Sequence, residues 1–287
     1  MTKKGVSNEE KFFLTRRTLL GLMALLPAAL ASRQSRAAMP LDGDFIQGGL
    51  LVGRADAGSK AALDGTEIKV YGDGRFLLGF GRDAAAKALL KVTMAGGVVE
   101  ARELAIAQRQ YEIQRIDNLP QNQVEPSEAE LARIKTERER IAVAKQRQTP
   151  MPFFDEGFDW PVRGPISGVY GSQRVLNGQP RQPHFGVDVA ASTGTPLKAP
   201  AGGVVSLADA DLFFTGGTVM LDHGYGLTSI FAHQSKIEVK EGDKLAKGDV
   251  FGLLGGTGRV TGPHLHWGIY LGTIPLDPQL LVPPMPS

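Results

Sequence analysis

The sequence predicts a mainly β protein that contains one α-helix. Glycine and proline are frequent, with 36 and 18 in 287 residues, which suits many short strands joined by turns. Short apolar runs alternate with glycine-containing steps over most of the chain, whereas residues 126–148 contain no glycine. A chain of this length is sufficient for two domains with buried cores.

Residues 1–37 resemble an export signal. The pair Arg16-Arg17, followed by Thr-Leu-Leu, resembles a twin-arginine signal. The apolar run over 19–31 is shorter than the roughly 20 residues that span a bilayer, and small residues predict cleavage after Ala37. We expect export to the periplasm or cell surface by twin-arginine translocation, with no stable transmembrane segment after cleavage. An ordinary secretory signal and an uncleaved anchor are the alternatives.

Composition excludes several classes of site. Because the chain has no cysteine, disulfides, thiolate metal sites and cysteine nucleophiles are absent. The formal charge is +2, but residues 1–37 hold seven basic and two acidic side chains. The remainder therefore has 25 basic and 28 acidic residues, a charge near −3, with no long basic run. Phosphate contacts need a concentrated positive surface, so we expect no nucleic-acid partner.

The first predicted domain covers residues 38–118. At least five short apolar runs separated by glycine turns lie between residues 41 and 116, which predicts a β-sandwich-like domain. The Asp73-Gly74 step predicts a hairpin, because a tight primed turn needs residues that tolerate positive φ. The segment has no histidine and no evident catalytic cluster, so we expect a spacer or a binding module.

A linker follows over 119–150, with a helix predicted at about 127–147. Ser127 and Glu130 have the spacing of a capping box at its start. A narrow stripe along the helix carries Leu131, Ile134, Arg138 and Ile141. The pattern indicates a mostly solvated helix that connects two domains, with a partner-binding role as the alternative.

The second predicted domain, residues 151–287, holds every histidine of the chain. These five residues are His184, His223, His233, His264 and His266. Residues 1–183 contain none, so the crowding in one domain indicates a functional site.

The spacing of these residues suggests a metal site. In a strand, side chains two or four residues apart lie on one face, so "HFGVDVA" aligns His184 with Asp188. In the same way "PHLHWGI" aligns His264 with His266 and leaves Trp267 for the core. Two strands can thus present four ligands to one cavity, and three such ligands with an open position are typical of catalytic zinc. A structural four-ligand site is the alternative.

Two further segments carry weaker signals. His223 lies in an Asp-His-Gly context, for which a structural role is the better interpretation. Residues 174–183, "RVLNGQPRQP", directly precede His184 and form either a loop at the rim of the site or a plain connector.

Three longer motifs resemble one family. They are "HFGVDVAASTGTPLKAPAGGVV", "LDHGYGLTSIFAH" and "EGDKLAKGDVFGLLGGTGRVTGPHLHWGIY". Together they resemble the lysostaphin/LytM-type zinc metallopeptidases, which cut peptidoglycan peptides, and the resemblance covers about residues 153–283. It implies an antiparallel β domain with one Zn²⁺ in a groove over the sheet.

The resemblance also implies a role for each residue. His184, Asp188 and His266 would be the zinc ligands. His264 would be the general base that takes a proton from zinc-activated water, and His233 would position water and stabilise the oxyanion.

The function implied is an exported zinc metalloendopeptidase that hydrolyses peptide cross-links of peptidoglycan. Its expected partners are stem peptides, cross-linked directly as D-alanyl–diaminopimelate or through a glycine bridge. One alternative is a catalytically weak LytM-type regulator that activates a cell-wall amidase, and another is a zinc-dependent wall-binding module. Whether the N-terminal domain or the helix covers the groove is open at this point.

Overall fold

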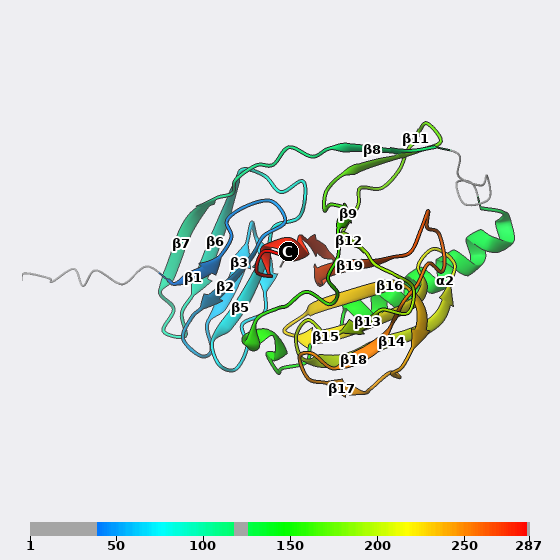
Figure 1. Cartoon of the computed structure of the whole chain (residues 1–287). Coiled ribbons are helices and arrows are strands. Elements are labelled where there is room, and N and C mark those ends of the chain that lie inside the picture. Colours follow the sequence, from blue (N-terminus) through cyan, green and yellow to red (C-terminus); the bar gives the residue numbers. More distant parts are fainter. Residues whose placement is uncertain (1–38, 118–125, 286–287) are drawn as a thin grey trace, which may run out of the picture. The chain divides into compact units, whose positions relative to one another are not determined.

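The computed structural model describes residues 39–117 and 126–285, so the signal expected at 1–37 lies outside the described residues. The mainly β fold is confirmed: strands dominate, and the described residues contain one α-helix and two short 3₁₀-helices (Figure 1). No helix among the described residues is long and apolar enough to cross a membrane. Ala38–Ser287 forms one compact unit, and the division at 118 and 150 stays a prediction.

Two antiparallel sheets make up the first described region. One sheet, in the order β1-β2-β5, consists of Leu41–Gly43, Leu50–Arg54 and Arg75–Gly79. The other, in the order β4-β3-β6-β7, consists of Thr66–Ile68, Lys60–Leu63, Lys87–Thr93 and Val99–Ala105. Phe76 and Leu78 of β5 share a buried cluster with Leu90 and Val92 of β6, whose side chains alternate between buried and exposed. This shared core confirms the β-sandwich-like prediction.

The tight hairpin of this region forms at a different Asp-Gly step from the one predicted. A turn is present at Asp73-Gly74, but β4 before it pairs with β3, and β5 after it pairs with β2. The two-residue hairpin instead joins β3 to β4 at Asp64 and Gly65, whose φ values are 49° and 83°. The turn signal is local, whereas strand pairing is decided by which apolar faces can be buried together.

The segment after this region pairs with the strand that precedes His184. β8 (Ile113–Ile116) runs parallel to β10 (Gln173–Leu176), and β10 continues into an antiparallel hairpin with β11 (Gln179–Pro180) (Figure 1). The stretch that we expected to be a rim loop or a connector is therefore a β-hairpin with a third strand beside it.

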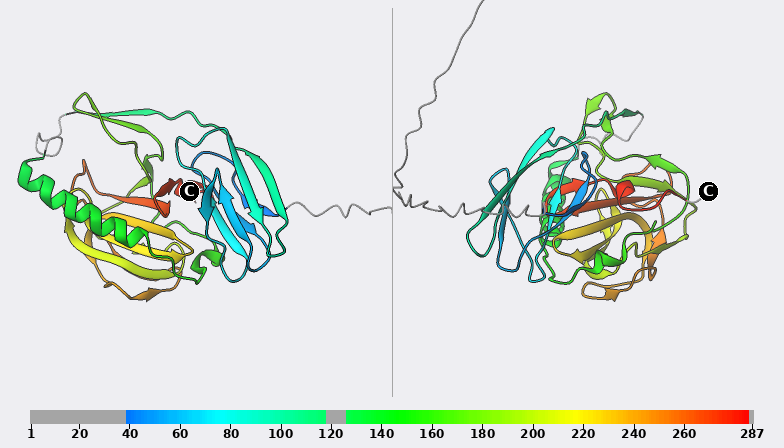
Figure 2. Two further views of the ribbon diagram at one scale, coloured as in Figure 1. Left: turned by 180° about the vertical axis from the view of Figure 1, so that it is seen from behind. Right: turned by 90° about the vertical axis from the view of Figure 1, so that its left-hand side faces the viewer.

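Helix α2 spans Glu128–Lys145, in agreement with the predicted 127–147. Ser127 is its N-cap, and the predicted capping box with Glu130 is present. The helix packs on β14 and β15 through Ile141 and Ala144, which join a cluster of sheet residues (Figure 2). It ends at Lys145 with Gln146 as its C-cap, ahead of Pro150.

The remaining strands form a ten-stranded sheet whose main order is β17-β14-β15-β16-β19-β12-β9. These strands are β9 Ile166–Gly168, β12 Val187–Ala190, β13 Pro196–Lys198, β14 Gly203–Leu212, β15 Gly216–Gly224, β16 Leu227–Ile237, β17 Lys244–Leu245, β18 Val250–Leu254, β19 His264–Leu271 and β20 Ile274–Leu276. The 3₁₀-helices are η1 (Phe153–Glu156) and η2 (Pro278–Leu280). Phe231, Phe251 and Trp267 are fully buried in the core of the ten-stranded sheet.

Contacts of two kinds join the first region to this sheet. Tyr71 stacks on Tyr225 with ring centroids 3.6 Å apart, and Tyr71 belongs to the core cluster of the large sheet. Arg109 Nη1 donates to the buried carboxylate of Asp277 at 2.7 Å. The two regions thus share apolar surface and an ion pair.

Candidate active site

Two neighbouring strands place Asp188 and His266 directly opposite each other. The register of β12 and β19 pairs Asp188 with His266 and Ala190 with His264, so both histidines lie on the face that carries the carboxylate. Leu265 and Trp267 are 0 % exposed on the other face, as the alternation predicted.

His184 reaches the same point from a loop. It precedes β12 and does not belong to the strand, so the predicted same-face alignment within one strand is wrong. Backbone hydrogen bonds hold it instead: its N–H donates to the carbonyl of Ser172 at 2.9 Å, and its own carbonyl accepts from Gly171 at 2.7 Å. The segment ahead of the strand therefore sets the position of this side chain.

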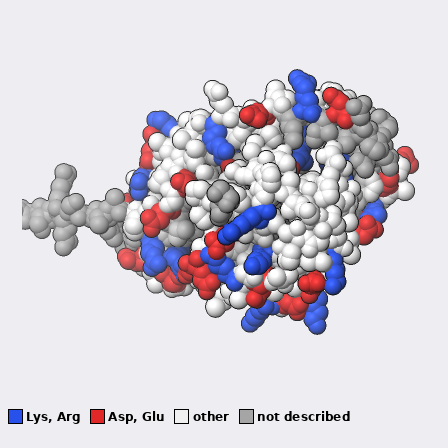
Figure 3. All heavy atoms as spheres, viewed as in Figure 1, with Lys and Arg blue, Asp and Glu red and all other residues white. Residues whose placement is uncertain are grey.

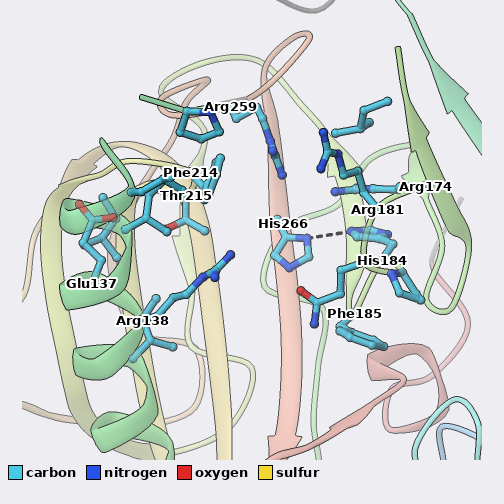
Figure 4. A pocket seen from close by; sticks show the side chains of 18 of the residues that line it. Glu137, Arg138, Arg174, Arg181, His184, Phe185, Phe214, Thr215, Arg259 and His266 are labelled. Atoms are coloured by element: carbon cyan, nitrogen blue, oxygen red, sulfur yellow. Dashed lines mark hydrogen bonds between the residues drawn. The ribbon is translucent and has the colours of Figure 1, made fainter. Parts of the chain in front are cut away.

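The three side chains converge on one point. His184 Nε2 lies 2.9 Å from His266 Nδ1 (Figure 4). Each of these nitrogens lies 2.9 Å from Asp188 Oδ1. All candidate ligand atoms of the group lie within 4.8 Å of one another. The structure thus brings together the three residues for which a metal role was inferred from the sequence.

The donor set fits a divalent cation such as zinc. Zn–N and Zn–O bonds of about 2.0–2.2 Å place neighbouring ligand atoms roughly 3 Å apart. Nδ1 of His184 faces the carbonyl of Val169 at 3.1 Å; because a carbonyl only accepts, Nδ1 carries the proton and Nε2 keeps its lone pair. Two imidazole nitrogens and one carboxylate oxygen at this separation form a donor set that one divalent cation can bind.

The electrostatics of the group favour an ionised carboxylate and a neutral imidazole. Burial alone would raise the pKa of Asp188, but the interactions with His184 and His266 outweigh it and hold this pKa well below its usual range. Burial lowers the pKa of His266 to about 4, although Asp188 opposes the shift. Metal ligands must be in these protonation states.

His233 and His264 lie beside the three converging residues. Their ring centroids are 4.8 Å apart, and His264 Nε2 is 3.9 Å from Asp188 Oδ1. Nδ1 of His264 faces the carbonyl of Gly262 at 2.8 Å, and Nδ1 of His233 faces that of Thr257 at 2.8 Å. Each carbonyl requires a proton on Nδ1, so a neutral ring leaves the Nε2 lone pair available.

An unusual backbone conformation orients His233. Ala232 lies opposite His266 on the site face, so strand alternation would place His233 with Phe231 on the core face. The φ of His233 is 67°, in the left-handed region, and this breaks the alternation within β16. Sequence periodicity could not reveal this orientation.

Arg174 is a contact residue that sequence reasoning did not identify. Its Nη2 donates to Asp188 Oδ2 at 3.0 Å, on the side of the carboxylate away from His184 and His266. The sequence feature that could have pointed to Arg174 was its place in the 174–183 segment, which directly precedes His184.

His223 lies away from this group and has a structural environment. It is fully buried at the end of β15, where Nδ1 donates to the carbonyl of Gly202 at 2.7 Å and Nε2 accepts from the Ser229 hydroxyl at 2.8 Å. Burial lowers its pKa to about 4.

A cavity of about 480 Å³ opens beside the metal-type group (Figure 4). His184 and His266 line it, together with residues of α2, of β10 and of the loop before β19. This volume is in the range of sites that accept small ligands or short peptide segments.

Comparisons with known proteins agree with this geometry. The model of peptidase family M23 matches residues 182–278. The DD-carboxypeptidase/endopeptidase Mpg of Neisseria meningitidis is 38% identical over 104 residues, 36% of this chain and 24% of that protein. The peptidoglycan DD-endopeptidase ShyA of Vibrio cholerae is 39% identical over 105 residues, 37% of this chain and 24% of that protein. The matched part thus spans about a quarter of the length of these curated relatives.

A solved structure extends the likeness beyond the matched segment. The crystal structure of a Pseudomonas aeruginosa protein assigned to peptidase M23 is 33% identical, with a TM-score of 0.62. The similarity covers 82% of this chain and 93% of that one, so it includes most of the described residues. On this evidence of sequence and fold together, the chain belongs to peptidase family M23.

Proposed function

We propose that this protein is an exported zinc metalloendopeptidase that hydrolyses peptide cross-links of peptidoglycan. The observation that supports this most is the set of three ligand atoms, of His184, Asp188 and His266, mutually 2.9 Å apart with two further histidines beside them. Export by the twin-arginine route belongs to the proposal, and so does the substrate, which the names of the two curated relatives suggest.

The metal would be held by His184, Asp188 and His266. Zn²⁺ in a three-ligand site supplies Lewis acidity, which activates water near neutral pH and polarises a scissile carbonyl. Arg174 contacts the outer oxygen of Asp188, which leaves Oδ1 as the oxygen directed at the metal. In this role Arg174 is a positioning residue.

His264 is proposed as the general base. With Nδ1–H donated to Gly262, the Nε2 lone pair faces the region beside Asp188 and can accept a proton from the attacking water. The same nitrogen can then return the proton to the leaving amine.

His233 is proposed to position the water. Burial lowers its pKa to about 3, so the ring is neutral near pH 7. With Nδ1–H donated to Thr257, Nε2 accepts a hydrogen bond and cannot donate one. This arrangement suits holding a water molecule better than donating to an oxyanion, which was the other role inferred for this residue.

Digestion of purified cell-wall sacculi tests the proposal. Residues 38–287 with zinc should cleave the peptide cross-links and so release soluble wall fragments, in which mass spectrometry identifies the cleaved bond. His264→Ala should release at least about 100-fold less. Lys87→Ala, an exposed change in the first region, serves as the matched control. Absence of release together with stimulation of a separate amidase would favour the regulator alternative.

A further inference from the structure

Four arginines gather in the cavity beside the candidate active site. Arg138 extends from α2, Arg174 from β10, Arg181 from the segment after β11, and Arg259 from the loop before β19. Figure 4 shows these side chains directed into the cavity from opposite walls. We call these four residues the arginine pocket.

Two acidic residues at the cavity, among those that the structure describes, are already engaged. Glu137 also lines the cavity, but its carboxylate pairs with Arg133 at 2.6 Å and accepts the N–H of Phe213 at 2.9 Å. Asp188 pairs with Arg174 while its other oxygen faces the metal-type group. Within residues 39–117 and 126–285, Arg138 forms no ion pair.

The guanidinium groups are close enough to repel one another. The pKa of Arg259 is lowered to about 10, first by burial and then by the positive charges of Arg174, Arg181 and Arg138. The Arg259 guanidinium lies over the ring of Phe214, 4.3 Å from its centroid, which holds it in place. Several guanidinium groups held around one cavity create a positive potential that favours a bound anion.

This concentration of one charge differs from the charge pattern on the face drawn in Figure 3. On the face drawn in Figure 3, the basic and acidic side chains of the described residues are interspersed. The cavity also has apolar walls, including Leu176, Phe185 and Tyr270. A pocket with apolar walls and several guanidinium groups suits an organic carboxylate, which a guanidinium can bind through two parallel hydrogen bonds.

We propose that the arginine pocket binds a free carboxylate of the peptide substrate close to the scissile bond. This inference rests on the proposed function and narrows it, because it selects acidic stem peptides over neutral glycine bridges. His184 and His266 line the same cavity as the four arginines, so one short peptide can contact both the metal-type group and the arginine pocket. Diaminopimelate cross-links carry such carboxylates by their chemistry, whereas internal glycine residues carry none.

A binding measurement with matched peptides tests the inference. The probe is a fluorescent stem-peptide dimer whose scissile amide is N-methylated to block cleavage, prepared with free carboxylates and with the same carboxylates amidated. By fluorescence polarisation, the zinc-loaded wild type should bind the free acid at least about tenfold more tightly than the amide. Arg138→Gln and Arg259→Gln should each reduce this ratio at least about threefold.

Arg140→Gln is the control, since this residue of the same helix lies outside the cavity lining and pairs with Asp209 at 2.6 Å. It should keep the wild-type ratio, and circular dichroism should show all three variants folded. Equal affinity of the wild type for acid and amide, or equal losses on both peptides in the pocket variants, would overturn the inference. Preferential binding of the acid without hydrolysis of cleavable peptides would instead refute the proposed function and leave this inference standing.

Discussion

Gly168 on β9 lies directly opposite Asp188 on β12, and the carboxylate occupies the space that a side chain at 168 would need. A Cβ on residue 168 would overlap Asp188 Oδ2 and lie 3.1 Å from the Asp188 Cβ. We expect Gly168→Ala to displace the carboxylate and to weaken metal binding by about 10–100-fold, a common cost of disturbing the surroundings of a metal ligand. Competition with a fluorescent zinc chelator measures this.

Gly96→Ala is the matched change for that measurement, because no atom lies within 4 Å of a Cβ at residue 96. It should bind zinc as the wild type does. Unchanged zinc affinity in Gly168→Ala would contradict the expectation that the close contact with Gly168 fixes the position of the Asp188 carboxylate.

Metal binding and proton transfer should separate by mutation. Asp188→Ala should lose bound zinc, measured as metal content per chain, and lose activity with it. His264→Ala and His233→Ala should retain the metal, because neither histidine belongs to the group of His184, Asp188 and His266. Each should lower kcat by about 10²–10⁴-fold. Loss of zinc from His264→Ala would assign that residue to the ligand set.

Acid should destabilise the protein through His223. Its pKa is about 4 in the fold and about 6.5 in an unfolded chain, so the unfolded state takes up the proton first. The stability contributed by a neutral His223 is complete above pH 6.5 and is lost as the pH falls toward 4, roughly 3 kcal/mol at most.

Urea unfolding of metal-free protein at several pH values between 7 and 4 tests this. The free energy of unfolding of His223→Gln should depend less steeply on pH than that of the wild type. The difference in slope should correspond to the uptake of at most one proton on unfolding. Parallel curves would mean that another group is responsible for the acid sensitivity.

The ion pair between Arg109 and Asp277 should stabilise the fold. Asp277 has a side chain 1 % exposed, so Arg109→Ala leaves its carboxylate buried without the guanidinium. We expect a loss of about 2 kcal/mol, seen as a lower midpoint of thermal unfolding. Lys87→Ala removes the exposed pair with Glu103 and should leave the midpoint unchanged. Equal midpoints for both variants would contradict a stabilising role for Arg109.

The part of the site that follows from strand alternation could be predicted from the sequence. Predicting that His264 and His266 share one face, with Trp267 on the core face, required only the two-residue period of a strand. Predicting the N-terminal cap of α2 required only the spacing of Ser127 and Glu130. Patterns of this kind are local, so they are visible in a single sequence.

The remainder depends on non-local contacts. The hydrogen bond from Arg174 to Asp188 joins the β10–β11 hairpin to strand β12. The positive φ of His233 is not a preference of histidine itself. Likewise, the choice between two Asp-Gly steps for the hairpin is made by sheet packing. No spacing rule contains this information, because each case joins segments far apart in the chain or reverses a local preference.

The parallel ladder between β8 and β10 has a consequence for protein engineering. Residues 113–116 are hydrogen-bonded to the strand that carries Arg174, so the part preceding α2 helps to build the wall next to Asp188. A chimera that grafts only residues 151–287 onto a foreign partner would leave an open edge on β10 and release the guanidinium of Arg174 from its position. The position of Arg174 beside Asp188 therefore depends on residues from both described regions, and a transplant must include residues 113–116.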